Sequence, residues 1–126
     1  MPGTLKTRVL VLGLFLFAVV SGCGLGQNKK RAPITEDEFI EITAQWAVLE
    51  ARYDYAINEA NQEGDAKKSN RLLANYEKAL EDLFKKHRIT TNDLVAFQYD
   101  NPGFAERYET TERILRRTET IFEELR

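Results

Sequence analysis

Apolar residues recur at alternating spacings of three and four along most of this chain, and this periodicity constrains its fold more than any other feature. The clearest stretch places seven apolar residues on one helical face: Phe39, Ile42, Trp46, Leu49, Tyr53, Ala56 and Ala60. Because an α-helix has 3.6 residues per turn, this spacing gives one stripe about six turns long. Nothing beyond the first 22 residues alternates with the period of two that is typical of a half-buried strand. We therefore predict an all-α domain.

The first helix has clear boundary signals. Thr35 and Glu38 have the spacing of a capping box, and Ile34 with Phe39 has the spacing of a hydrophobic staple. The acidic residues of this first turn complement the positive end of the helix dipole, so they do not indicate a metal site. Gly64, together with the aspartate after it, is expected to end or kink the helix.

Three more helices are predicted. The second runs from about residue 66 to residue 87, and its stripe is Leu73, Tyr76, Leu80, Leu83 and His87. Residues 89–94 repeat the start signals of residues 34–39, with Asp93 in place of a glutamate, which makes an imperfect capping box before a short helix over about 91–98. Asn101 and Pro102 are expected to open the last helix, because proline is favoured at the first helical position.

The stripe of this last helix is Phe104, Tyr108, Thr111, Leu115, Thr118, Phe122 and Leu125. Short connections between helices favour antiparallel neighbours. The expected architecture is a small antiparallel bundle of three long helices and one short helix.

The first 22 residues differ from this helical body. Lys6 and Arg8 precede an apolar run over residues 9–20. As a helix this run would reach only about 18 Å, short of the roughly 30 Å of a bilayer core, so it is typical of a signal peptide and a membrane-spanning helix is the weaker interpretation.

The run is followed by Val20, Ser21, Gly22 and Cys23, which resemble the lipobox of bacterial lipoproteins. The resemblance implies cleavage between Gly22 and Cys23 and attachment of acyl chains, such as palmitate, to the new N-terminal cysteine. More than one chain would give stable anchoring, because a single chain binds a bilayer only marginally.

The resemblance also implies a location in the bacterial cell envelope. Gly24 follows the cysteine where an aspartate retains many lipoproteins at the inner membrane, which favours the outer membrane in a Gram-negative host; in a Gram-positive host the anchor would lie on the outer face of the cytoplasmic membrane. Residues 23–34 are then the lipidated terminus with a flexible tether, and residues 35–126 are the helical domain. Anionic headgroups would attract Lys29, Lys30 and Arg31 of the tether, although any soluble linker could have this composition.

The composition argues against several classes of function. Removal of the leader takes away two of the 18 basic residues and leaves all 20 acidic ones, so the body is a poor general ligand for nucleic acid. His87 is the only histidine, which excludes a multi-histidine metal site within one chain, and Ser69, the only serine after the leader, lacks the turn of a nucleophile. We therefore expect no catalytic residue, no metal and no cofactor.

The leading hypothesis is a non-enzymatic lipoprotein whose domain binds another envelope protein, as a scaffold or in a pilotin-like role. On the last helix, two threonines make the stripe less suited to a contact buried only within the domain, and two isoleucines broaden its apolar face. This face therefore leaves room for a partner protein or a homodimer contact. These residues are Thr111, Ile114, Thr118 and Ile121. An ordinary core is the alternative interpretation of this face.

A second functional hypothesis is a module that binds a small ligand or a lipid in a pocket between helices. The body itself resembles small helical envelope lipoproteins of unknown function: a capped first helix, a second helix that ends in the sequence Lys-His-Arg-Ile-Thr over residues 86–90, and a last helix that begins at Asn101 and Pro102.

Overall fold

The computed structural model describes residues 31–126, and this part of the chain forms four α-helices and no strand. They are α2 (Glu36–Gln62), α3 (Ala66–His87), α4 (Thr91–Asp100) and α5 (Tyr108–Glu124). The predicted all-α fold of the body is therefore confirmed. Gly22 and Cys23, on which the expected cleavage and lipidation depend, lie outside the described residues.

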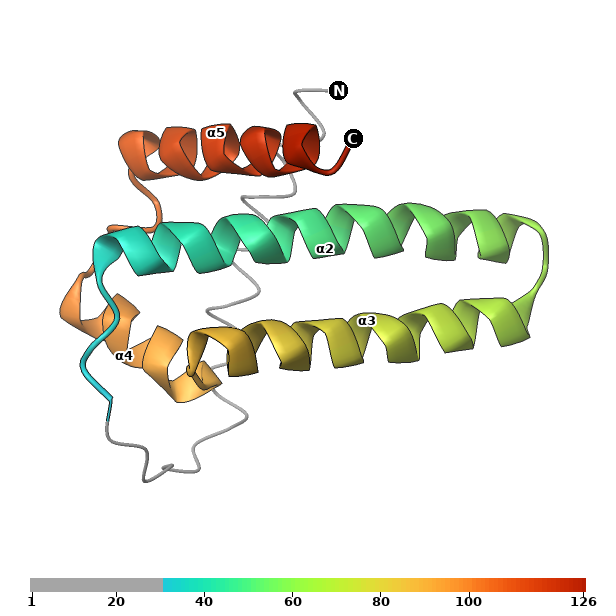
Figure 1. The fold of residues 1–126 in the computed structure, drawn as a ribbon, viewed down its shortest axis with the longest axis horizontal. Helices are drawn as coiled ribbons and strands as arrows, with labels where there is room; N and C mark the ends of the chain where they lie inside the picture. The colour runs from blue at the N-terminus through green and yellow to red at the C-terminus, as the bar shows by residue number, and fades with distance from the viewer. Residues whose placement is uncertain (1–30) are drawn as a thin grey trace.

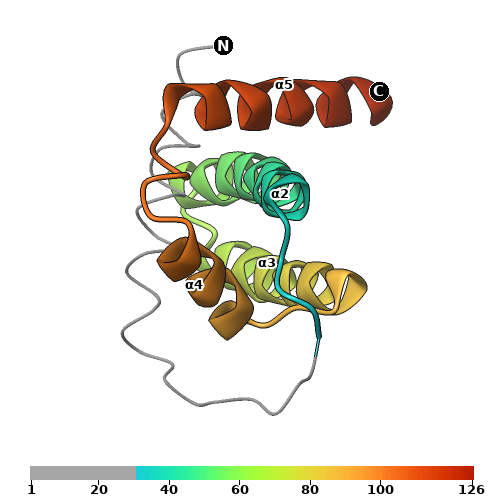
Figure 2. The same ribbon diagram turned by 90° about the vertical axis from the view of Figure 1, so that its left-hand side faces the viewer.

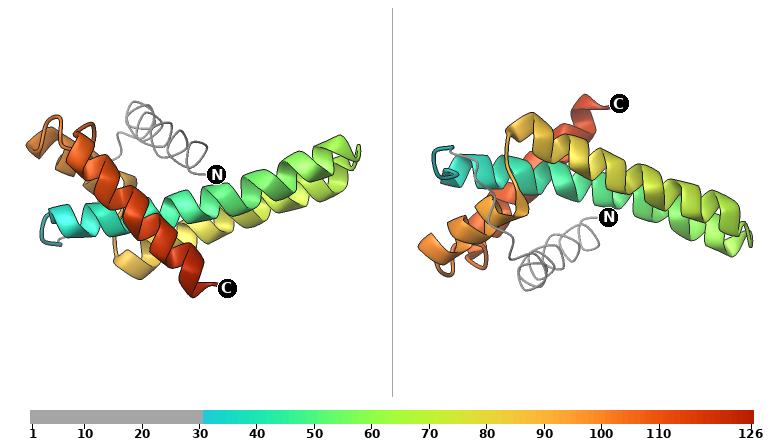
Figure 3. Two further views of the ribbon diagram at one scale, coloured as in Figure 1. Left: turned by 90° about the horizontal axis from the view of Figure 1, so that it is seen from above. Right: turned by 90° about the horizontal axis from the view of Figure 1, so that it is seen from below.

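α2 is the central helix of the domain. α3 runs antiparallel along one side of it, and α5 lies on the opposite side (Figures 1 and 2). Seen from above, α5 crosses α2 obliquely, so the antiparallel arrangement is that of the α2–α3 pair (Figure 3). α4 packs beside the beginning of α2 and connects α3 to the segment that leads into α5.

The core surrounds the first half of α2. The apolar side chains that it buries include Phe39, Ile42, Trp46, Leu83, Leu94, Phe97, Phe104 and Ile114. Beyond this core, α2 and α3 continue as a two-helix hairpin that neither α4 nor α5 covers (Figure 1). We call residues 53–76 the arm, and Ala60 is its only fully buried residue.

A hydrogen-bonded group of side chains joins α2 to α3 at the base of the arm. The indole Nε1 of Trp46 donates to the hydroxyl of Tyr76 at 2.9 Å, and this hydroxyl donates to Glu50 Oε2 at 2.7 Å. Burial, reinforced by the bond to Glu50, raises the pKa of Tyr76 well above its ordinary value. The phenol therefore stays protonated and can donate to the carboxylate at all physiological pH values.

The predicted start signals form the caps that the sequence indicates. Thr35 and Glu38 form a complete capping box, with both backbone-to-side-chain bonds at 3.1 Å. The box of Thr90 and Asp93 is also complete, because the Asp93 carboxylate still reaches the backbone N–H of Thr90, at 2.7 Å. This second capping box therefore makes both of its hydrogen bonds, although we expected it to be imperfect. Gly64, at φ +73°, makes the turn between α2 and α3 in a conformation that favours glycine.

The predicted start of the last helix is wrong. α4 extends to Asp100, the chain then makes turns, and α5 begins only at Tyr108. The side chain of Asn101 caps the preceding helix instead, because its Nδ2 donates to the carbonyl of Phe97 at 2.9 Å. Gly103 has a φ of +79°, which a right-handed helix does not accept, and this turn brings Phe104 into the core.

Candidate functional site

The described chain begins at Arg31, which is bound to the domain at two places. Its Nη2 donates to Glu38 Oε2 at 2.9 Å, and its Nη1 donates to the backbone carbonyl of His87 at 3.0 Å. The hydrogen bond from Arg31 is the main reason why the pKa of Glu38 lies below its usual value. Arg31 thus holds the end of the tether between the start of α2 and the end of α3.

A second polar group connects α3, α2 and α5. His87 Nε2 lies 3.1 Å from Gln45 Oε1, and the amide of Gln45 donates to Glu41. Arg117 forms a two-point ion pair with Glu41, with Nε–Oε1 at 2.6 Å and Nη2–Oε2 at 3.1 Å. One turn away, Arg113 pairs with Asp37.

The charges of this group link the three helices structurally. The hydrogen bonds from Arg117 are the main cause that lowers the pKa of Glu41, and burial, helped by the charge of Lys86, lowers the pKa of His87. Two-point arginine–carboxylate pairs fix geometry as well as charge. Among residues 31–126, no three histidine, cysteine or acidic side chains converge on a position that could hold a metal ion.

The face proposed for a partner from the sequence is covered within the chain. Thr111, Ile114 and Thr118 are buried, with Thr118 fully inaccessible, and Ile121 packs against the core. The Thr118 hydroxyl donates to the carbonyl of Ile114 at 2.7 Å, so its polar group is satisfied inside the helix. The expectation of a partner face here is thus corrected, and the ordinary-core interpretation describes these residues.

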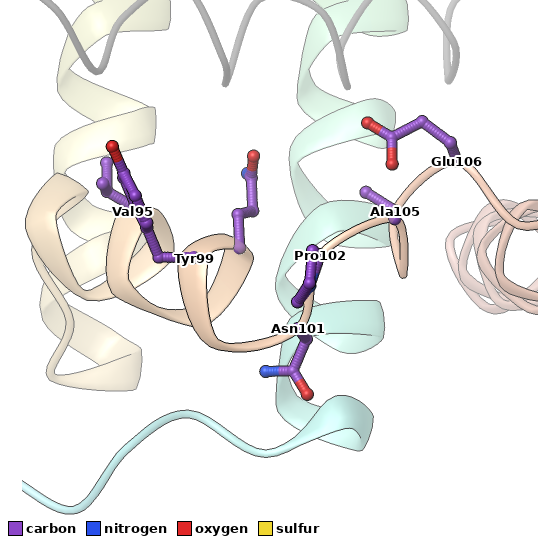
Figure 4. A pocket seen from close by; sticks show the side chains of 8 residues that line it. Val95, Tyr99, Asn101, Pro102, Ala105 and Glu106 are labelled. Atoms are coloured by element: carbon purple, nitrogen blue, oxygen red, sulfur yellow. The ribbon is translucent and has the colours of Figure 1, made fainter.

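An apolar surface is instead exposed between α4 and the turns that follow it. A hollow of about 490 Å³ opens there, and we call it the α4 hollow. Its lining residues are Val95, Gln98, Tyr99, Asn101, Pro102, Gly103, Ala105 and Glu106. Val95 and Tyr99 stand on α4, whereas Ala105 and Glu106 come from the returning segment on the other side (Figure 4).

Tyr99 dominates this surface, because the residue is 80% exposed. Pro102 and Gly103 are also exposed, whereas Val95 and Ala105 are half-buried. The α4 hollow is therefore open to solvent along its rim. Its floor is apolar, and the carboxylate of Glu106 and the amide of Gln98 add polar groups at the edge.

Three packed aromatic rings hold the walls of the α4 hollow in place. Phe97 of α4 stacks on Phe39 of α2 with ring centroids 4.6 Å apart and ring planes inclined by 15°. Phe104 of the returning segment meets the edge or face of both rings, at 5.5 Å from Phe97 and 6.0 Å from Phe39. This site was not expected from the sequence, because the segment after Asn101 was predicted to be helical.

Comparison of the chain with family models, with curated proteins and with solved structures finds no match. Within the described residues, no helix combines the length and the apolar character needed to cross a bilayer. Any functional conclusion therefore rests on the sequence motif at Cys23 and on the geometry of the domain.

Proposed function

We propose that this protein is a lipid-anchored, non-enzymatic lipoprotein of the bacterial cell envelope, and that its helical domain binds another envelope protein through the α4 hollow. The motif from Val20 to Cys23 supports the anchor. The observation that carries the binding role is an open apolar hollow, outside the core, with a large aromatic side chain exposed at its rim.

Exposed aromatic side chains beside an apolar depression are typical of protein interfaces. A tyrosine buries a large area on contact and keeps a hydroxyl for a hydrogen bond, which makes it a frequent anchor of binding energy. Tyr99 meets this description, and the surrounding Val95 and Pro102 extend the apolar area. The occupant that fits is an apolar segment of a protein with a basic side chain nearby to pair with Glu106.

A small ligand or a lipid chain is the second candidate occupant. The volume of the α4 hollow lies within the range of about 300–1,000 Å³ that is usual for ligand pockets. Such pockets enclose most of the ligand surface, however, and the exposed Tyr99 and Pro102 leave this one open. A protein segment can cover both the floor and the rim, so the protein occupant is favoured.

The test places a photo-crosslinking residue at Gln98, on the rim, in the native cell. We expect one discrete crosslinked protein, identified by mass spectrometry. Tyr99→Ser should lower its yield, because truncation of an anchor of this kind costs roughly 2 kcal/mol or more, which is about thirtyfold in affinity.

Tyr55→Ser is the matched control, because Tyr55 is similarly exposed, at 73%, but lies on the arm. It should leave the yield unchanged, and circular dichroism should show that both variants are folded. Equal losses in the two variants, or no product at Gln98, would refute binding at the α4 hollow. A thermal shift with envelope lipids that Tyr99→Ser abolishes would point to the lipid occupant.

A further inference from the structure

Charge is unevenly distributed over the layers of the domain. α3 carries six basic side chains and three acidic ones, whereas α2 carries seven acidic side chains and one basic one. On α3 the exposed basic residues Lys67, Arg71, Lys78 and Lys85 follow at spacings of four, seven and seven. These spacings return to the same side of a helix, so the four residues form one stripe.

The stripe points away from the rest of the molecule. The apolar side chains of α3, such as Leu80 and Leu83, pack against the core, so the opposite side of the helix is the outer surface. α5 lies on the far side of α2 (Figure 1). Two of the four stripe residues are paired with acidic side chains, Lys85 with Glu81 at 2.9 Å and Lys78 with Asp82 at 3.9 Å. Because α3 has six basic and only three acidic side chains, it still has an excess of positive charge.

The tether leaves the domain on this same side. Arg31 is bound to the carbonyl of His87, the last residue of α3. In two perpendicular views, the described chain begins beyond α3, on the side away from α5 (Figures 1 and 2). Seven residues lie between Cys23 and Arg31, so the two residues are eight positions apart and at most about 29 Å from each other when the chain is fully extended. A bilayer anchor at Cys23 is therefore close to the basic side of the domain.

We propose that the outward stripe of α3 lies against the anionic headgroups of the anchoring membrane, with the arm along the bilayer and α5 facing away from it. This orientation rests on the proposed lipid anchor. Electrostatic attraction of basic side chains to anionic lipid acts only within about one Debye length, roughly 8–10 Å, so it needs a domain that is already held at the surface. The anchor supplies this, because it keeps the effective concentration of the domain at the bilayer high.

The experiment uses the acylated protein, purified from its native membrane and reconstituted into vesicles. A fluorophore is attached to Ala74→Cys on the outer side of α3 or to Thr120→Cys on α5, both exposed positions, since the acylated Cys23 does not react. Quenching by nitroxide headgroups is measured in vesicles of phosphatidylcholine alone and in vesicles that contain phosphatidylglycerol.

With phosphatidylglycerol present, we expect quenching at position 74 to exceed that at position 120 severalfold, and high salt should remove the difference. Replacing Lys67, Arg71 and Lys78 by glutamine should abolish it. A control that removes three exposed positive charges elsewhere should not, and the residues for it are Arg52, Arg116 and Arg126.

The outcomes separate the two proposals. A protein that stays on both kinds of vesicle but shows equal quenching at the two positions would overturn the orientation and leave the anchor intact. Binding of the stripe to an acidic protein rather than to lipid would also overturn the orientation and leave the anchor intact, because quenching at position 74 would then not depend on phosphatidylglycerol. A protein that floats with neither vesicle would overturn the anchor and the orientation together.

Discussion

Phe97→Leu is expected to destabilise the domain through the ring contacts that hold α4 on α2. Phe97 is buried, it stacks on Phe39 at 4.6 Å, and it meets Phe104 edge to face at 5.5 Å. Leucine keeps the position apolar but removes both ring pairs. Each such pair is worth about 0.5–1.5 kcal/mol beyond its buried area, so the variant should lose about 1–3 kcal/mol of unfolding free energy.

The assay is urea denaturation followed by circular dichroism, with thermal unfolding as a second measure. In a domain of this size each kcal/mol lowers the midpoint by roughly 4–8 °C. Hydrogen exchange should show the largest loss of protection in α4, because the ring pairs connect this short helix to the rest of the core.

Phe122→Leu is the matched control. Phe122 is half-buried on α5 and stacks on no other ring in the part of the chain that the structure describes. Its replacement should lower the unfolding free energy by less than about 1 kcal/mol, since only apolar area is lost. Equal losses of unfolding free energy in the two variants would refute the claim that ring contacts hold the walls of the α4 hollow.

Three further predictions concern single positions. Thr43→Val should raise the unfolding free energy by about 1 kcal/mol in urea denaturation, because the buried Thr43 hydroxyl has no hydrogen-bond partner among residues 31–126; Thr118→Val, whose hydroxyl is bonded, should give no such gain. The thermal midpoint should fall as the pH drops below about 6.5, because burial lowers the pKa of His87 and the unfolded chain then binds more protons than the folded one; His87→Gln should flatten this part of the profile, and an unchanged slope would contradict the assignment. Gly64→Ala should lower the unfolding free energy by about 1 kcal/mol, because φ is +73° there, while no atom of the described residues lies near enough to clash with the added methyl group; a stabilised variant would show that the turn tolerates alanine.

The helices that were predicted well have boundary signals close in sequence. Thr35 with Glu38 and Thr90 with Asp93 are three residues apart, so the pairing of their groups follows from the local sequence once a helix forms there. Gly64 likewise acts through its own backbone conformation. Such features can be read from a sequence because the interacting groups are neighbours in it.

The last helix was predicted poorly because a distant contact decided its start. Asn101 and Pro102 form a good local start signal, but burial of Phe104 against Phe39 requires turns at this point. The ion pair of Arg117 with Glu41 joins residues 76 positions apart. On the same helix Ile114 is buried in the core, while Leu115 of the predicted stripe is only half-buried. No spacing in the sequence reports these contacts.

The candidate functional residues also differ in whether a local motif or a distant contact determines them. Cys23 was recognised from a motif of four consecutive residues and stays a prediction, since it lies outside the described chain. The α4 hollow could not be foreseen, because Val95 and Ala105 line it from two segments that only the packing of Phe97 and Phe104 brings together. Tyr99, two residues after the buried Phe97, lies on the surface.

The intact mass of the protein isolated from its native membrane is the decisive measurement for the lipid anchor. We expect a chain that begins at residue 23 and carries the added mass of its acyl groups. A mass that still includes residues 1–22, or one that matches the bare polypeptide from residue 23, would contradict the lipid anchor and every proposal about the envelope that depends on it.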